Sequence, residues 1–128
     1  MNFKSLSLAA AAAIAIAMPA WAHHSHANYQ TLEWTNLGGT VKEVHWLNPH
    51  VWVYLQTMDD KGSAKLWTLE GGSPGALTRG GWKKDTVKVG DTITVENGAL
   101  AKDPRNNWVG ALNSTALVLS TGQKLTMR

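Results

Sequence analysis

The histidines of this 128-residue chain are the residues whose number and spacing point to a chemical function. All five lie in two groups, three near the amino terminus and two further along: His23, His24, His26, His45 and His50. Imidazole nitrogens bind borderline divalent metals, such as Cu(II) and Ni(II), near neutral pH. The grouping therefore predicts a metal site built on the first three histidines, with one of the other two as a remote ligand.

The residues before the first histidine decide which atoms the amino-terminal group can offer. Lys4, an apolar run over residues 6–18 and the sequence Ala20-Trp21-Ala22 follow the order of a secretory signal peptide. The run is shorter than the about 20 apolar residues of a membrane-spanning helix, and Pro19 interrupts it, which disfavours an uncleaved anchor. We therefore expect residues 1–22 to be removed, leaving a periplasmic protein without a transmembrane segment.

Signal cleavage would add a nitrogen ligand to the first group. A chain that starts at His23 offers its α-amino group beside an imidazole, and a further imidazole completes the tetragonal nitrogen set that Cu(II) prefers. A chain that starts at His24 places His26 third, where the amine, two backbone amides and the imidazole form a square-planar site. Both starts favour Cu(II) or Ni(II), and Cu(II) is the leading ion. The alternatives are a histidine tract that binds metals loosely without a function, and an ordinary hydrogen-bonding role for His45 and His50.

Composition argues against several other functions. The net charge is +3 and the basic residues are scattered, which disfavours nucleic acid as a partner. The chain contains no cysteine, so thiolate metal sites and thiol catalysis are excluded and packing alone must hold the fold. The Gly-rich residues 71–75 lack the Lys-Ser/Thr ending of a phosphate loop, and we expect no serine-based hydrolysis. The expected protein is therefore not an enzyme.

Apolar and polar residues alternate along residues 50–57, which predicts a β-strand. The valines and the leucine of this strand share the face that turns to the core, and the opposite face carries His50, Trp52 and Tyr54. A strand over residues 39–47 precedes it, and we expect the two to form a hairpin. A change of register by one residue would reverse the faces on which the histidines lie. The sequence therefore does not decide whether His45 and His50 lie in one site.

A third strand, a short helix and further strands follow the hairpin. The third strand is expected over residues 63–70, and Ser73, Pro74 and Gly80 are typical N-cap, first-turn and end residues of a short helix. Later strands are expected over residues 89–96, 108–112 and 115–120 and after a turn at 121–123, with a polar loop over 97–107.

This order of elements predicts a mainly β fold: a small five- to six-stranded barrel, OB-like, with one short helix between strands 3 and 4. A β-sandwich or a simple up-and-down barrel gives much the same pattern. We expect three parts, a signal peptide over residues 1–22, a mature N-terminal histidine-containing segment over residues 23–37, and a β-barrel domain over residues 38–128.

Several short motifs occur together in the chain: Ala22-His23-His24-Ser25, Gly39-Thr40-Val41-x-x-Val44-x-Trp46-x-Asn48-Pro49-His50, Trp67-x-x-Glu70-Gly71-x-x-Pro74, Gly81-Trp82 and Val89-Gly90-Asp91. In this combination, which spans nearly the whole mature chain, the sequence resembles a family of small exported bacterial proteins classed as a domain of unknown function. The resemblance implies a secretory signal and a compact β-rich domain, and it brings no activity or catalytic residues. Ser25-His26 departs from the Ser-Phe of the family, so no family role passes to His26.

Aromatic side chains provide a second candidate surface. Most tryptophans are expected to pack in the core or on strand faces, but Trp46, Trp52 and Tyr54 can line a ligand surface. The leading hypothesis is a periplasmic small binding protein for Cu(II). One alternative is a metal-independent interaction module that holds a peptide, a saccharide or another envelope protein on this aromatic face. A copper-dependent oxidative enzyme is the third, and it would require an open coordination position.

Overall fold

The computed structural model describes residues 25–128. The predicted signal peptide, His23 and His24 lie outside the described residues, and the side chain of His26 is not described. The elements are a 3-10 helix η2 (Ser25–Asn28), strands β1 (Tyr29–His45), β2 (Trp52–Met58) and β3 (Ala64–Glu70), helix α2 (Pro74–Arg79), and strands β4 (Thr92–Ala101), β5 (Trp108–Gly110), β6 (Ala116–Leu119) and β7 (Lys124–Thr126).

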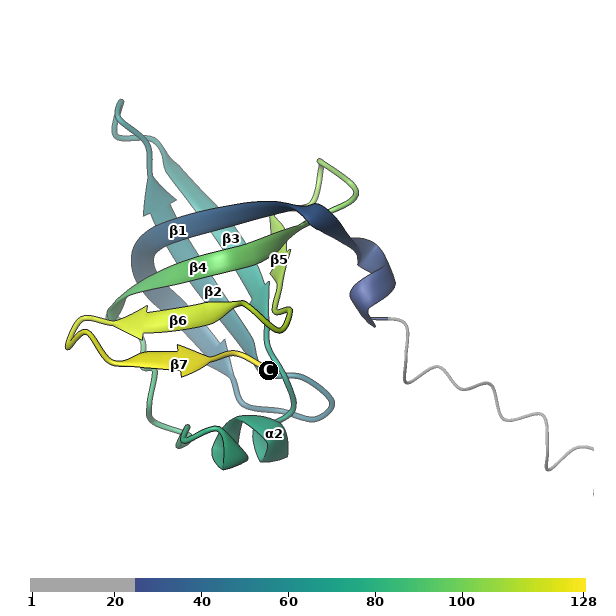
Figure 1. Cartoon of the computed structure of the whole chain (residues 1–128). Coiled ribbons are helices and arrows are strands. Elements are labelled where there is room, and N and C mark those ends of the chain that lie inside the picture. The colour runs from purple at the N-terminus through teal and green to yellow at the C-terminus, as the bar shows by residue number, and fades with distance from the viewer. Residues whose placement is uncertain (1–24) are drawn as a thin grey trace, which may run out of the picture.

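Five strands close into a barrel in the order β1-β2-β3-β5-β4, and the pairing of β4 with β1 completes the circle (Figure 1). The β3–β5 pair is parallel and the other four pairs are antiparallel. β6 pairs with β4, and β7 pairs with β6 as the last strand of the sheet. The predicted mainly β fold, with a small OB-like barrel and one short helix after the third strand, is confirmed.

β1 is longer than predicted because it pairs with two neighbouring strands along successive parts of its length. It begins at Tyr29, ten residues before the expected start, and its first part pairs with β4 while its second part pairs with β2. Residues 29–37, which the sequence assigns to the N-terminal segment, therefore form part of the barrel wall. Gly39 lies where the pairing of β1 passes from β4 to β2, and it permits the close approach of the two backbones, because a Cβ atom there would lie 2.1 Å from the carbonyl oxygen of Gln56.

β4 also runs past its predicted end, where a polar loop was expected from Asn97 onward. Asn97 has a φ of 54°, and its backbone N–H donates to Oδ1 of Asn36 at 2.9 Å. Asparagine tolerates this left-handed conformation better than most residues. The polar residues that indicate a loop thus mark an irregularity inside the strand, next to the register shift between Thr35 and Leu37 in β1.

The short helix forms where its capping residues predict it. Oγ of Ser73 accepts a hydrogen bond from the backbone N–H of Ala76 at 3.1 Å, and Pro74 opens the helix. Leu77 is the buried residue of this helix and joins the core, so α2 lies against one end of the barrel (Figure 1). In residues 25–128 no helix is long and apolar enough to cross a membrane.

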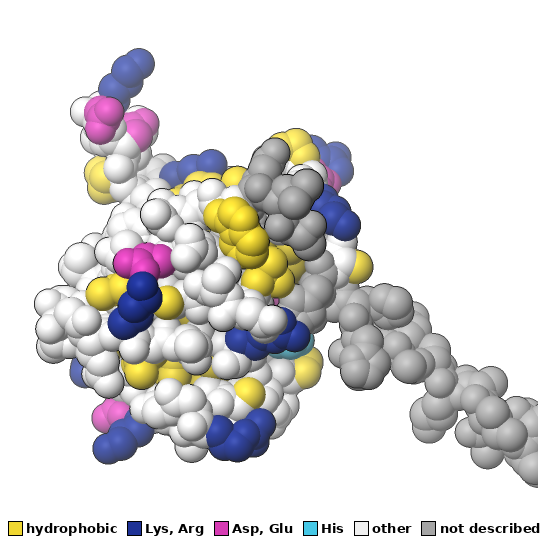
Figure 2. Space-filling model, viewed as in Figure 1, with side chains coloured by type: hydrophobic (Ala, Val, Ile, Leu, Met, Phe, Trp, Pro, Cys, Tyr) yellow, Lys and Arg dark blue, Asp and Glu magenta, His cyan; other side chains and the backbone are white. Residues whose placement is uncertain are grey.

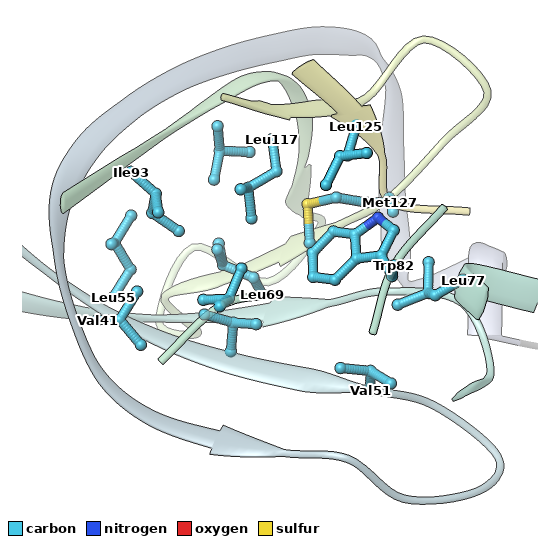
Figure 3. Close-up of a cluster of buried hydrophobic side chains, with 14 of the residues drawn as sticks. Val41, Val51, Leu55, Leu69, Leu77, Trp82, Ile93, Leu117, Leu125 and Met127 are labelled. Carbon is cyan, nitrogen blue, oxygen red and sulfur yellow. The ribbon is translucent and has the colours of Figure 1, made fainter. Parts of the chain in front are cut away.

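The barrel interior is filled by aliphatic side chains together with Trp82 and Met127 (Figure 3). Val51, Val53 and Leu55 are at most 1% exposed, as the alternation in the sequence predicts. Burial of each such side chain contributes about 1.5–3 kcal/mol to folding. Charged side chains, in contrast, are scattered over the face seen in Figure 2 rather than gathered in one patch.

Candidate functional site

A pocket of about 90 Å³ lies where five parts of the chain meet. These parts are the start of β1, the β1–β2 loop, the end of β3 with the residues after it, and the segments after β5 and β7. They contribute the lining residues Tyr29, His50, Glu70, Gly71, Gly72, Ala111 and Arg128. Histidine, carboxylate and phenol groups from three of these parts are in contact inside it. The pocket is therefore the place in the described chain where side chains with chemical capacity converge.

Tyr29 is the first residue of β1, and its side chain is 2% exposed. Its hydroxyl donates a hydrogen bond to Oε2 of Glu70. Its ring lies flat against Gly110, where a Cβ atom would come within 2.7 Å of the ring. Burial raises the pKa of the Tyr29 phenol well above its usual value, and the hydrogen bond to Glu70 and its negative charge act in the same direction. Tyr29 is therefore a fixed hydrogen-bond donor to the carboxylate.

His50 presents one ring nitrogen to the backbone and the other to Glu70. Its Nδ1 lies 3.0 Å from the carbonyl oxygen of Gly71, and because a carbonyl only accepts, Nδ1 carries the proton. In the neutral ring Nε2 then keeps its lone pair, and it lies 3.5 Å from Oε1 of Glu70. Two acceptor atoms thus face each other, and either a second proton on the ring or a bound cation satisfies both.

The backbone around His50 explains its orientation. The sequence places His50 inside a strand and on its outer face, but β2 begins at Trp52. Two hydrogen bonds instead join Val51 to the residues after β3: its N–H donates to the carbonyl of Gly72 at 2.9 Å, and its carbonyl accepts from Gly71 at 2.8 Å. These bonds hold His50 beside Gly71, so the imidazole turns toward the end of β3.

His45 lies elsewhere and makes different contacts. It ends β1 opposite Trp52, its Nε2 lies 2.5 Å from Oε1 of Glu43, and its ring meets the edge of Tyr54 at a centroid distance of 5.1 Å. The two histidines of the first hairpin therefore contact different carboxylates, His45 that of Glu43 and His50 that of Glu70. Of these two, His50 lines the pocket. Among the described residues, no group of three or more His, Asp or Glu side chains is placed to hold a metal ion.

The three aromatic residues of the predicted ligand surface do not share one face. Trp46 packs against the core, with its ring centroid 6.5 Å from that of Trp82. Trp52 and Tyr54 are half-buried on the outer side of β2, opposite the buried Val53. A surface on β2 can use these two residues, together with His45, but not Trp46.

The Gly-rich residues 71–75 read Gly-Gly-Ser-Pro-Gly, which matches the Gly-x-Ser-x-Gly pattern of serine hydrolases between a strand and a helix. The structure gives the serine another role. Ser73 has an ordinary extended conformation, with φ −68° and ψ 157°, and its hydroxyl caps α2. The strained turn of a nucleophile elbow is absent at this position, so the match is a helix cap.

A second hollow, a groove of about 420 Å³, lies on another part of the barrel. β5 is too short to fill the space between β3 and the end of β4, and the β4–β5 loop borders the opening. Trp67, Leu100 and Pro104 supply apolar surface, and the remaining lining residues include Lys65, Lys102, Asn106 and Asn107. The ammonium group of Lys65 lies 4.2 Å from the centroid of the Trp67 ring.

A family model, described as a family of unknown function (DUF6152), matches residues 11–110. The chain belongs to DUF6152. The resemblance that its motifs indicate is thereby confirmed, and the matched range contains Tyr29, His50 and Glu70. No curated protein and no solved structure matches this DUF6152 chain significantly. The family carries no assigned activity, so a function must be argued from the pocket and from the histidines.

Tyr29 and Glu70 are the site residues that sequence reasoning missed. Tyr29 falls in the predicted N-terminal segment, and no spacing rule links it to Glu70, which is 41 residues away. The available signal was the motif Trp67-x-x-Glu70-Gly71, in which a carboxylate ends a strand immediately before a glycine. That signal places Glu70 at the end of the barrel but does not name its partners.

Proposed function

We propose that this DUF6152 protein is a small exported metal-binding protein of the periplasm that takes up Cu(II) with its mature N-terminal histidines. His23, His24 and His26 supply the first ligands, and His50 is the ligand that the barrel adds. The observation that carries the proposal is the orientation of His50, whose Nδ1 is held by a backbone carbonyl while its Nε2 faces Glu70 in the pocket whose lining includes the first residue of β1. The signal peptide that the sequence predicts over residues 1–22 supports the compartment and the free amine.

The length of the N-terminal segment supports the choice of His50. Tyr29 lines the same pocket as His50, and His23 precedes Tyr29 by six residues. Residues 25–28 form the 3-10 helix η2, which rises about 2.0 Å per residue, and the two residues before it add at most about 3.3–3.6 Å each. His23 therefore has a reach of roughly 15 Å from the start of β1. This reach supports an approach of His23 to the pocket, and His50, unlike His45, lines that pocket.

The nature of the ligands supports Cu(II) as the leading ion. A terminal amine and several imidazoles form a nitrogen-rich set, which Cu(II) prefers in a tetragonal geometry and binds more tightly than its first-row neighbours. His50 already has its Nδ1–H on a backbone carbonyl, the arrangement usual for a metal-bound histidine. Little reorganisation of the ring is then needed when the ion arrives.

Calorimetric titration with Cu(II), Ni(II) and Zn(II) tests the proposal. The protein starting at His23 is compared with one that carries an extra glycine ahead of His23, and with the variants His50→Gln and His45→Gln. We expect the extra residue and His50→Gln each to weaken Cu(II) binding on the order of tenfold or more. His45→Gln should bind like the parent protein. Equal, weak binding by all four proteins would contradict the proposal.

A metal-independent interaction module is the second candidate, and the groove between β3 and β4 favours it. Its apolar floor and lysine-bearing rim suit a peptide, a saccharide or another envelope protein with acidic groups. A partner that remains bound in the presence of a chelator, and is lost in Trp67→Ala but not in His50→Gln, would support this candidate.

A further inference from the structure

Glu70 faces the free nitrogen of His50 across a gap of defined size. Nε2 of His50 and Oε1 of Glu70 are 3.5 Å apart, which is longer than a strong hydrogen bond. Two ligand atoms bound to one ion at about 2.0–2.2 Å lie roughly 2.9 Å apart at a right angle and roughly 3.4 Å apart at the tetrahedral angle. One metal ion therefore fits between these two atoms almost without movement.

The groups behind the two atoms hold them in place. The carbonyl of Gly71 fixes the ring of His50 through Nδ1, and the hydroxyl of Tyr29 fixes the Glu70 carboxylate through Oε2. Metal-bound histidines and carboxylates are commonly held by such outer hydrogen bonds, which leave the ligand atoms free. In the pocket both outer bonds are made while Oε1 and Nε2 remain open to an ion.

The pocket also has room for an ion and further ligands. Its volume of about 90 Å³ exceeds the roughly 30 Å³ that one water molecule takes in the liquid. Glu70 is the carboxylate among the described lining residues, and its side chain is 11% exposed. Arg128 also lines the pocket, and its guanidinium donates to Oδ1 of Asn113, outside the lining, at 2.7 Å. A cation therefore finds one partly desolvated carboxylate and one imidazole nitrogen.

We propose that Glu70 is a metal ligand together with His50, that Tyr29 is the positioning residue of the Glu70 carboxylate, and that the pair forms a preformed half-site for a divalent cation on the barrel. The inference rests on the proposed function, because it concerns the same ion. Because the separation of the pair is closest to a tetrahedral angle, the half-site accepts Zn(II) or Co(II) as well as Cu(II).

The test is metal titration of Glu70→Gln with Zn(II), Cu(II) and Co(II). Glutamine keeps the shape and still accepts the Tyr29 hydrogen bond, but it loses the negative charge. We expect a loss of affinity on the order of tenfold or more and a change in the visible spectrum of bound Co(II). Glu43→Gln, which alters the carboxylate beside His45, is the matched control and should bind like the parent protein. Tyr29→Phe should weaken binding less than Glu70→Gln and also alter the Co(II) spectrum.

The outcomes separate this inference from the proposed function. Parent-like binding by Glu70→Gln, with weak binding by His50→Gln, would overturn the role of Glu70 and leave the function standing. Loss of binding in both variants, with no effect of an extra residue ahead of His23, would keep the half-site and overturn the N-terminal site. Glu70→Asp, which keeps the charge and shortens the reach, replaces Glu70→Gln if the latter does not fold, and the same loss is expected.

Discussion

The hydroxyl of Tyr29 donates a hydrogen bond to the carboxylate of Glu70 and so ties the first residue of β1 to the last residue of β3. These strands are not neighbours in the barrel, because β2 separates them on one side and β4 and β5 on the other. The contact thus spans the end of the barrel. It also joins the start of the wall, where the histidine-containing segment ends, to the carboxylate beside His50.

Tyr29→Phe should destabilise the protein by about 1.5–3 kcal/mol, because the partly buried carboxylate of Glu70 loses a hydrogen bond that involves a charged group. Thermal or denaturant unfolding in the presence of a chelator measures the effect. Tyr54→Phe, on the half-buried outer side of β2, is the control and should change stability by no more than about 0.5 kcal/mol. An equal, small effect of both substitutions would contradict the role of the Tyr29–Glu70 bond.

The Tyr29 phenol should stay protonated in the folded protein at pH values where it ionises after unfolding. Its pKa is raised in the fold by burial and by Glu70, so the stability that this group contributes is complete below the unfolded pKa of about 10 and declines as the pH rises above it. Phenolate absorbance of the metal-free protein measures this directly. At pH 11 the parent protein and Tyr29→Phe should absorb alike when folded, and the parent should gain one phenolate more on unfolding. An extra phenolate in the folded parent would contradict the buried donor.

Gly39→Ala should destabilise the barrel strongly, whereas Gly38→Ala should be tolerated. A Cβ atom at Gly39 would lie 2.1 Å from a backbone oxygen of Gln56, but at Gly38 the nearest atom is Oγ1 of Thr94 at 3.8 Å. We expect a loss of several kcal/mol, or failure to fold, for the first variant and a change within about 1 kcal/mol for the second. Denaturant unfolding of the two variants checks the expectation. Similar unfolding midpoints would show that the backbone of β1 does not lie close to that of β2 at Gly39.

Arg128→Gln should tighten divalent metal binding, because it removes the positive charge of a residue that lines the pocket. The gain should be a few-fold at low ionic strength and should shrink at high salt, as expected for charges that are partly exposed to solvent. Titration of the parent and the variant with Zn(II) at two salt concentrations measures it. Lys124→Gln, which breaks the surface ion pair between Lys124 on β7 and Glu96 on β4, is the control for a general change of net charge. An equal gain in both variants would show a long-range effect rather than one of the pocket.

Local patterns allowed much of the barrel to be predicted. The buried face of β2 follows from the alternation of Val51, Val53 and Leu55 with polar or aromatic residues, since successive side chains of a strand point to opposite faces. α2 follows from Ser73 as N-cap and Pro74 at the first position, which act on the backbone within one turn. Such signals depend on a few consecutive residues, so the structure they predict does not depend on contacts with distant parts of the chain.

The sequence by itself determined the succession of strands along the chain, the buried face of β2, the capped helix and the motifs of the family. Only the tertiary structure decided which histidine of the first hairpin meets a carboxylate. The bulge between Val41 and Glu43 and the pairing of Val51 with residues 71–72 direct His45 to the outer wall and His50 to the pocket. Tyr29 and Glu70 meet for the same reason: register and barrel closure bring together side chains that no local spacing connects.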